Sequence, residues 1–264
     1  GKRPEIDIKS NHGIHYDWTY GNFGNPEFQK LYVKAKKGQW DSDDLAWNTS
    51  VDPSNFELQI FPEKLQPMYG TDMYRKLDRK KQGEMLHSTI AWLLSQFLHG
   101  EQGALYAAAM TVEATPWMGA KYYGSTQVMD EARHVEVFSK YIDTKLNKLY
   151  TINDNLFVVI HALTSTGDWD LKFLGMQIMI EGLALGAFGL IYKFTKEPLL
   201  RELLKQVISD ESRHVHYGVE ALRDYYTKEC PEYVRRDRED WAYEVTIMLR
   251  NRFMFTEFYE EYFT

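Results

Sequence analysis

The pentad Asp-Glu-x-Arg-His occurs twice in this chain, at residues 130–134 and again eighty positions later at residues 210–214. On a helix, residues three apart share a face, so each pentad places its Glu and its His side by side. A single Glu-x-x-His is usually a surface pair, but two copies with suitable partners form the halves of one dimetal site. The repeat therefore favours a fold in which two helices distant in sequence face each other.

Two further glutamates lie in apolar helical stretches, Glu101 in LHGEQGALYAA and Glu181 in MIEGLALGAF. A buried carboxylate without a partner is costly, which indicates that each of them has one. Carboxylate-bridged dimetal bundles add one such Glu from each of two helices to two Glu-x-x-His motifs. The predicted metal-ligating and catalytic residues are therefore Glu101, Glu131, His134, Glu181, Glu211 and His214.

The spacing of these residues predicts two helical hairpins. The first Glu of each half precedes the Glu of its pentad by 30 residues. Two residues at one height of an antiparallel hairpin each lie about 15 residues from its turn, so turns are expected near residues 116 and 196. Pro116 and Pro198, which interrupt helices, stand at these places.

Helical periodicity dominates the chain after residue 72, and no run of alternating β-branched residues indicates a sheet. We expect an all-α single domain, residues 1–264, built on a four-helix bundle. Its parts are a wrapping arm at 1–70, a dimetal core at 79–227 and an additional helix at 232–261. The long core helices are expected at 79–114, 117–149, 170–194 and 197–227, with a short helix at 154–164.

Composition excludes several classes of protein. The net charge is −7 and the Lys and Arg residues are scattered, so no nucleic-acid-binding surface is expected. The single cysteine, Cys230, excludes an internal disulfide and a four-thiolate metal site, and it favours a cytoplasmic location. Residues 171–192 are long and apolar enough for a membrane span, but Glu181 would cost roughly 2.5–3.5 kcal/mol in lipid. We therefore expect a buried bundle helix there and no membrane span.

The aspartates of the two pentads, Asp130 and Asp210, suggest a supporting role. A metal-bound His usually donates its second ring N–H to a carboxylate, and each Asp could accept from the His of the other pentad. The alternative is an ion pair with the Arg of its own pentad, at the exposed edge of the motif.

The paired motif resembles the ferritin-like superfamily of di-iron carboxylate proteins, and its Asp-Glu-x-Arg-His form is most similar to bacterial multicomponent monooxygenases. The resemblance covers residues 79–220 and implies a ferritin-like four-helix bundle. It also implies two iron ions that activate dioxygen. Carboxylate and imidazole donors suit iron or manganese, so manganese or a mixed Mn/Fe pair stays open.

Three positions depart from patterns within that superfamily. Phe138 stands where the radical-generating subunit of ribonucleotide reductase usually has Tyr. Leu185 stands where the multicomponent hydroxylases have Thr. Val207 stands where the aminobenzoate N-oxygenase type adds a His. No single subfamily therefore matches at every position.

The residues around the ligands are mostly apolar, with Gln127 and Gln177 as expected polar exceptions. An oxygenase needs a dry pocket that keeps water away from its reactive centre, whereas an iron-storage site needs a hydrophilic path for ions. Apolar surroundings therefore favour an oxygenase. We therefore expect a monooxygenase or oxidase that acts on an apolar or aromatic small molecule. An iron-handling ferroxidase or storage protein and a radical-generating subunit remain alternatives.

Electrons for such a reaction must come from another protein, because the chain has no flavin or nicotinamide fingerprint and no iron–sulfur cysteines. A ferredoxin or reductase partner is expected, and a homodimer is an open alternative. Comparison of the two halves suggests that space for substrate lies at the small residues Ala108 and Gly218.

Overall fold

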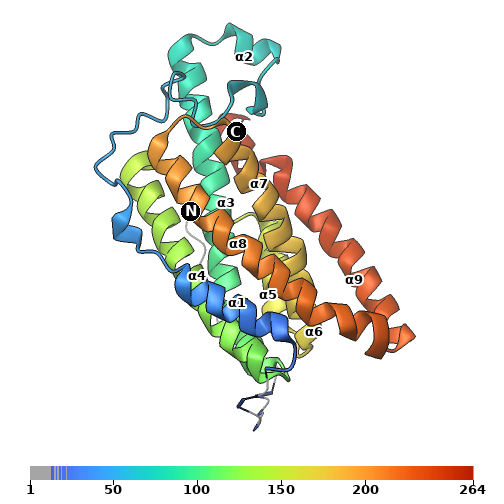
Figure 1. Cartoon of the computed structure of the whole chain (residues 1–264). Coiled ribbons are helices and arrows are strands. Elements are labelled where there is room, and N and C mark those ends of the chain that lie inside the picture. The colour runs from blue at the N-terminus through green and yellow to red at the C-terminus, as the bar shows by residue number, and fades with distance from the viewer. Residues whose placement is uncertain (1–12, 15, 17, 19, 22, 264) are drawn as a thin grey trace.

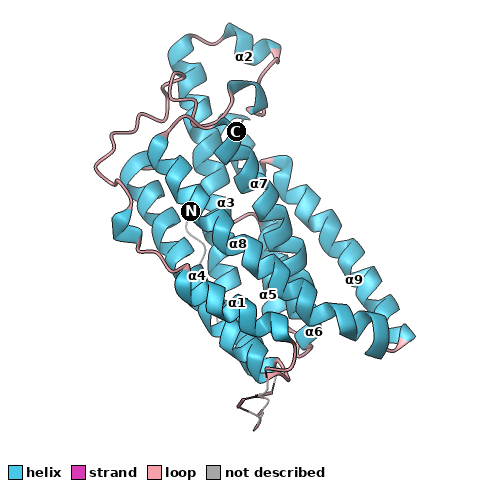
Figure 2. Ribbon diagram, in the orientation of Figure 1, coloured by secondary structure: helices cyan, strands magenta, loops and turns pink. Residues whose placement is uncertain are grey.

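The structure, a computed structural model, describes residues 13–263 except 15, 17, 19 and 22. All regular elements within this part of the chain are helices, so the predicted all-α fold is confirmed (Figures 1 and 2). The core helices are α3 (Arg79–Ala114), α4 (Met118–Tyr141), α7 (Glu181–Phe194) and α8 (Pro198–Asp224). The surrounding helices are α1 (Pro26–Lys37), α2 (Asp72–Lys76), α5 (Asp154–Ser165), α6 (Trp169–Phe173), α9 (Glu232–Asn251) and α10 (Thr256–Phe263).

Short 3₁₀ and π turns connect or extend these helices. The 3₁₀ turns are η1 (Ser42–Asp44), η2 (Glu63–Leu65) and η6 (Arg252–Met254). The π turns are η3 (Ile142–Leu146), η4 (Leu174–Ile180) and η5 (Tyr225–Glu229). Because η4 leads directly into Glu181, it sets the rotation of that side chain about the helix axis.

Both helical hairpins turn where the sequence predicts. The helix α3 ends at Ala114 and packs against α4, while α7 ends at Phe194 and packs against α8. Glu197 caps α8 by accepting hydrogen bonds from two backbone N–H groups of its first turn. The hydroxyl of Tyr141 in α4 donates to the same carboxylate over 2.8 Å, so the two hairpins are joined at this end.

The N-terminal arm contains a helix that belongs to the packed interior. The helix α1 lies across α4 and α8 and buries Phe28, Leu31 and Ala35 (Figure 1). After α1 the chain runs past α4 and α8 and then continues to α2, at the top of the view in Figure 1. Residues 1–12 of the predicted arm lie outside the described residues.

The predicted additional C-terminal helix is present, but it is divided into α9 (Glu232–Asn251) and α10 (Thr256–Phe263). The chain breaks after α9, where Phe255 adopts a left-handed conformation with φ 54°. Phe255 stacks on Trp92 of α3 at 4.1 Å between ring centres, and the Trp92 indole N–H donates to Glu257 over 2.9 Å. These contacts with a helix far away in sequence stabilise the break, which local periodicity does not reveal.

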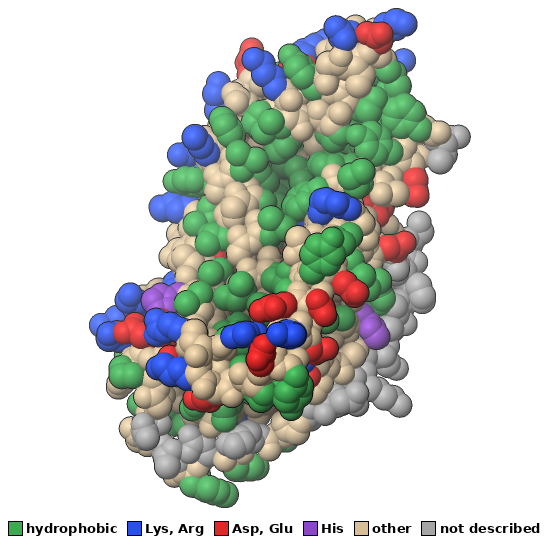
Figure 3. Space-filling view, turned by 90° about the vertical axis from the view of Figure 1, so that its right-hand side faces the viewer, with side chains coloured by type: hydrophobic (Ala, Val, Ile, Leu, Met, Phe, Trp, Pro, Cys, Tyr) green, Lys and Arg blue, Asp and Glu red, His purple; other side chains and the backbone are tan. Residues whose placement is uncertain are grey.

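The apolar segment Trp169–Phe194 is long and apolar enough to cross a membrane by length and composition, and 39% of its most apolar stretch is buried. Its buried face carries Gln177 and Glu181 into the bundle. The sequence predicted a buried helix here, but the other face of the segment is partly exposed, since Leu183 and Leu190 are accessible to solvent. Figure 3 shows the face of the molecule that lies on the right-hand side of Figure 1, where hydrophobic side chains gather in the upper middle and charged ones lie below them and along the edges.

Gly175 in η4 allows close packing just before Glu181. A Cβ at this position would lie 2.0 Å from Leu163 Cδ2 in α5 and 2.7 Å from the Trp241 ring in α9. Gly186 in α7 has no such neighbour within 4 Å.

Gly175→Ala is therefore expected to destabilise the protein by about 1–3 kcal/mol, because Leu163 and Trp241 must move. The matched Gly186→Ala change should stabilise it by roughly 0.5–1 kcal/mol through helix propensity. Urea unfolding of both variants and the parent chain measures the difference. Equal midpoints for the two variants would contradict the packing described for Gly175.

Candidate metal centre

Each core helical stretch contributes one glutamate at the same level of the bundle, and α4 and α8 each add a histidine. None of these residues is more than 5% exposed. Their donor atoms form two groups whose members lie within 4.8 Å of one another. The groups are Glu101, Glu131, His134 and Glu211, and Glu131, Glu181 and His214. The structure thus brings together all six residues selected from the sequence.

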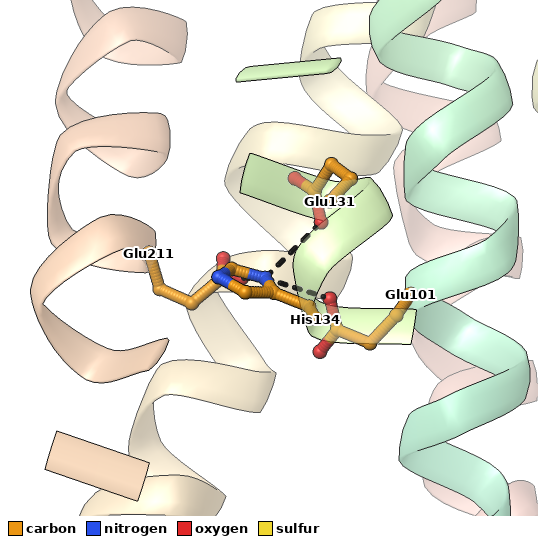
Figure 4. Close-up of side chains that lie close together, drawn as sticks. All are labelled: Glu101, Glu131, His134 and Glu211. Carbon is orange, nitrogen blue, oxygen red and sulfur yellow. Dashed lines mark hydrogen bonds and ion pairs between the residues drawn. The ribbon is translucent and has the colours of Figure 1, made fainter. Parts of the chain in front are cut away.

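The glutamate of each pentad reaches toward both histidines. Glu131 places Oε2 3.4 Å from Nδ1 of His134 and Oε1 3.1 Å from Nδ1 of His214. Glu211 places Oε1 3.1 Å from Nδ1 of His134 and Oε2 3.4 Å from Nδ1 of His214. Glu101 approaches His134 alone, at 3.2 Å (Figure 4). The arrangement has two central carboxylates and one outer carboxylate on the side of His134.

Several of these atoms approach one another without forming hydrogen bonds. Among the described residues, no hydrogen-bond partner is available to Nδ1 of His214 or to Oε2 of Glu131, Glu181 and Glu211. Buried polar atoms normally have partners, so unsatisfied atoms that converge on one place fit metal ions better than a hydrogen-bond network. Donors about 2.0–2.2 Å from a common ion lie at separations of this kind. The nitrogen and oxygen donor set suits iron or manganese.

Two buried glutamines hold the carboxylates in position. Nε2 of Gln127 donates to Oε1 of Glu181 over 2.9 Å and to Oε1 of Glu131 over 3.1 Å. Nε2 of Gln177 donates to Oε1 of Gln127 over 3.2 Å. Both glutamines are fully buried, and they are the polar exceptions that the sequence indicated.

The pentad aspartates make both of the contacts considered from the sequence. Nε2 of His134 lies 3.2 Å from Asp210, and Nε2 of His214 lies 3.3 Å from Asp130, so each Asp meets the His of the other pentad. Arg133 also donates to Asp130 over 2.6 Å. A carboxylate has two oxygens, which allows both contacts. The ion pairs are buried rather than exposed, because the Arg133 side chain is only 6% accessible.

Residues of the N-terminal arm also contact the pentad aspartates and Arg133, and the sequence did not predict these contacts. The Trp40 indole N–H donates to Asp210 over 2.8 Å. Gln39 donates to Asp130 over 3.0 Å and accepts from Arg133 over 2.8 Å. These residues precede their partners by at least 91 positions, and no local pattern identified them.

Burial and mutual charge shift the acidities of the cluster. Burial, reinforced by Glu211, raises the pKa values of Glu101 and Glu181 well above the usual range. Burial would also raise the pKa of Glu131, but His214 and His134 hold it well below its usual value. Burial would lower the pKa of His134, but hydrogen bonds to Asp210 and Glu101 raise it well above. Metal ions that bind these groups must therefore displace protons.

A cavity opens beside the carboxylates, between α3, α7 and η6. It is small, with a volume of about 20 Å³ available to the centre of a water-sized sphere. Its lining comprises Gln96, Phe97, Gly100, Glu101, Ala104, Ile180, Glu181, Ala184, Glu211 and Arg252. In the sequence, only the small residues one turn from Glu101 and Glu181 indicated a cavity here. No sequence pattern indicated that Arg252 would line it.

The sequence suggested Ala108 and Gly218 as the places to look for substrate space, but neither residue lines this cavity. A Cβ on Gly218 would lie 2.6 Å from Gln177 Cβ and 3.1 Å from Ile178 Cδ1. Gly218 therefore permits close approach of α8 and η4 rather than leaving room for a ligand.

A model of the family described as "P-aminobenzoate N-oxygenase AurF" matches residues 27–257. No curated protein matches the chain. Among solved structures, a mutant R2-like ligand-binding oxidase with anaerobically reconstituted Mn/Fe cofactor is 17% identical, with a TM-score of 0.56 over 94% of this chain and 89% of that chain. A second mutant in the same state is 18% identical, with a TM-score of 0.56 over 94% and 92%. An aerobically reconstituted form is 18% identical, with a TM-score of 0.54 over 91% and 82%.

The buried ion pairs behind the histidines lead to a prediction about stability. Arg133→Met leaves Asp130 and Asp210 short of a positive partner, and it is expected to destabilise the metal-free chain by about 3–5 kcal/mol. Lys205→Met removes an exposed pair with Glu202 and should cost less than about 1 kcal/mol. Denaturant unfolding measures both changes, and similar values for the two would contradict the buried network.

Proposed function

The chain belongs to the p-aminobenzoate N-oxygenase AurF family, and from this we propose that it is a di-iron oxidoreductase that uses dioxygen to oxidise a small aromatic molecule. The observation that carries the proposal is the convergence of four carboxylates and two imidazoles. Four of their donor atoms, one on His214 and one on each of Glu131, Glu181 and Glu211, lack hydrogen-bond partners among the described residues. Iron is the metal that we propose for the site. Manganese is a second candidate, because the R2-like oxidases of similar fold hold an Mn/Fe cofactor.

The six residues divide naturally between two ions. Glu101 and His134 would hold one ion, Glu181 and His214 the other, and Glu131 would join the two groups to which it belongs. Glu211 faces both histidines and would do the same. When bound, the two metal ions supply the redox chemistry and the open positions that dioxygen needs.

The surrounding residues would orient the ligands and exclude water. Asp210 and Asp130 contact the outer nitrogen Nε2 of each histidine, so Nδ1 faces the site. Gln127 fixes one oxygen each of Glu131 and Glu181. The apolar part of the cavity lining, with Phe97 and Ile180, would keep water away from a substrate next to the carboxylates.

The reaction needs an electron source outside this chain. Transfer of one oxygen atom from dioxygen to a substrate consumes two electrons and two protons, and the second oxygen atom leaves as water. The sequence contains no motif for a flavin, nicotinamide or iron–sulfur group, so we propose a ferredoxin or reductase as donor. The cytoplasmic location and a homodimer likewise stay predictions.

Metal uptake tests this proposal. The chain is expected to bind two ferrous ions under anaerobic conditions and then to consume dioxygen, as measured by elemental analysis and an oxygen electrode. Glu131→Gln removes a carboxylate that belongs to both donor groups and should reduce metal content below one ion per chain. Glu136→Gln, an exposed position on the same helix, should leave metal content unchanged.

Other results would support the alternatives. Uptake of far more than two ions, together with the native mass of a large cage, would indicate iron storage. A stable complex with a second catalytic subunit and no turnover alone would indicate a radical-generating subunit. Loading with two ions but no oxygen consumption would contradict the oxygenase proposal.

A further inference from the structure

Gln127 lies between two carboxylates of the candidate metal centre and contacts both. It is fully buried in α4. Its Nε2 donates to Oε1 of Glu181 over 2.9 Å and to Oε1 of Glu131 over 3.1 Å, which uses both hydrogens of the amide. Oε2 of Glu181 has no hydrogen-bond partner among the described residues, so it remains available to an ion. Gln127 therefore fixes the orientation of both carboxylates.

A second buried glutamine, Gln177, sets the orientation of the Gln127 amide. Nε2 of Gln177 donates to Oε1 of Gln127 over 3.2 Å. Because Oε1 of Gln127 accepts this bond, its Nε2 faces the carboxylates. The reverse orientation would place the amide oxygen against carboxylate oxygens. Both glutamines are inaccessible to solvent, so water does not compete for these bonds.

The other half of the centre has no such amides. The offset of eighty residues that relates the two pentads pairs Gln127 with Val207. The same offset pairs Gln177 with Phe97. Val207 and Phe97 are buried and apolar, so neither side chain can donate a hydrogen bond to a carboxylate.

Glu101, the counterpart of Glu181, is held less firmly as a result. Among the described residues, its carboxylate makes one hydrogen bond, with Nδ1 of His134 over 3.2 Å. That nitrogen is itself a proposed metal ligand, so this bond is lost once His134 binds an ion. Glu101 then has no fixed donor of the kind that Gln127 offers to Glu181.

We infer that Gln127 is a positioning residue that makes the two halves of the centre unequal. Its hydrogen bonds hold Glu181 ready for an ion, so the half with Glu181 and His214 binds metal first and more tightly. The half with Glu101 and His134 binds the second ion more weakly, because ordering its carboxylate costs affinity. This inference deepens the proposed function, since it rests on the same pair of metal positions.

Anaerobic titration of the metal-free chain with manganese(II) tests the inference, with the unbound ion measured by electron paramagnetic resonance. The parent chain should bind two ions in two resolved steps. Glu101→Gln should keep the tighter step, whereas Glu181→Gln should lose it, which identifies the half that fills first. Two equal affinities in the parent chain would overturn the inference. Loss of the tighter step in Glu101→Gln, with its retention in Glu181→Gln, would do so as well.

A change at Gln127 itself tests its role. Gln127→Met keeps the length of the side chain and removes both N–H donors. The tighter affinity should fall about 10-fold to 100-fold, the usual loss when a group that orients a metal ligand is removed, while the weaker affinity stays unchanged. Gln102→Met, a change at an exposed glutamine beside Glu101, should alter neither step. Equal losses in both steps of Gln127→Met would show a general structural effect and contradict the inference.

A second variant, Gln177→Met, covers the case of a folding defect at position 127. It leaves Gln127 in place but removes the donor that orients its amide. The tighter affinity should fall by a smaller factor than in Gln127→Met, and the weaker one should again stay unchanged. Circular dichroism of the metal-free variants shows which of them fold. If Gln127→Met does not fold, Gln177→Met decides, and an unchanged tighter affinity in that variant would sink the inference.

Metal content and oxygen consumption keep the two proposals apart. If the parent chain binds two ferrous ions and consumes dioxygen, but its two affinities do not depend on Gln127, only the role of Gln127 fails. If the two steps differ and depend on Gln127, but the iron-loaded chain consumes no dioxygen, only the proposed function fails. A parent chain that binds no metal would overturn both.

Discussion

The burial of many carboxylates in one apolar bundle is the constraint on which this structure depends. Every core helical stretch places a glutamate at the same level, and two aspartates follow behind the histidines. Such groups are tolerated only when cations or hydrogen-bond donors surround them. Arg133 and Arg213 serve the aspartates, whereas converging atoms of the glutamates keep no partner among the described residues. The two hairpins bring the carboxylates together, and the glutamines and the arm supply hydrogen-bond donors to them.

The two halves of the centre contain the same types of proposed ligand, but the residues and backbone around these ligands differ between the halves. A π turn precedes Glu181 and the regular helix α3 carries Glu101, so the two outer glutamates sit in different backbone contexts. The arm contacts the aspartates through Trp40 and Gln39, and the C-terminal turn contributes Arg252 to the cavity. The repeated residues are the proposed metal ligands, while the residues that line the cavity beside them differ between the two halves.

The chain belongs to the aminobenzoate N-oxygenase family, but its proposed ligands include no donor at position 207. The sequence expectation was a seventh donor at position 207 for the aminobenzoate N-oxygenase type, and Val207 argued against that type. The family match overrules this, although Val207 is fully buried in the hydrophobic core and offers no donor atom. A centre with six donors leaves one more coordination position for water, dioxygen or substrate than a centre with seven.

The sequence by itself determined the proposed ligands and the hairpins that carry them, because helical spacing and a 30-residue interval are local, periodic properties. Only the tertiary structure decided where a cavity opens beside them. Gly218 is filled by Gln177, whereas space opens near Gly100 and Ala184. The break at Phe255, which brings Arg252 to that space, depends on stacking against Trp92, more than 160 residues earlier. Contacts between such distant segments leave no trace in local periodicity, which is why helix faces were predictable and the cavity was not.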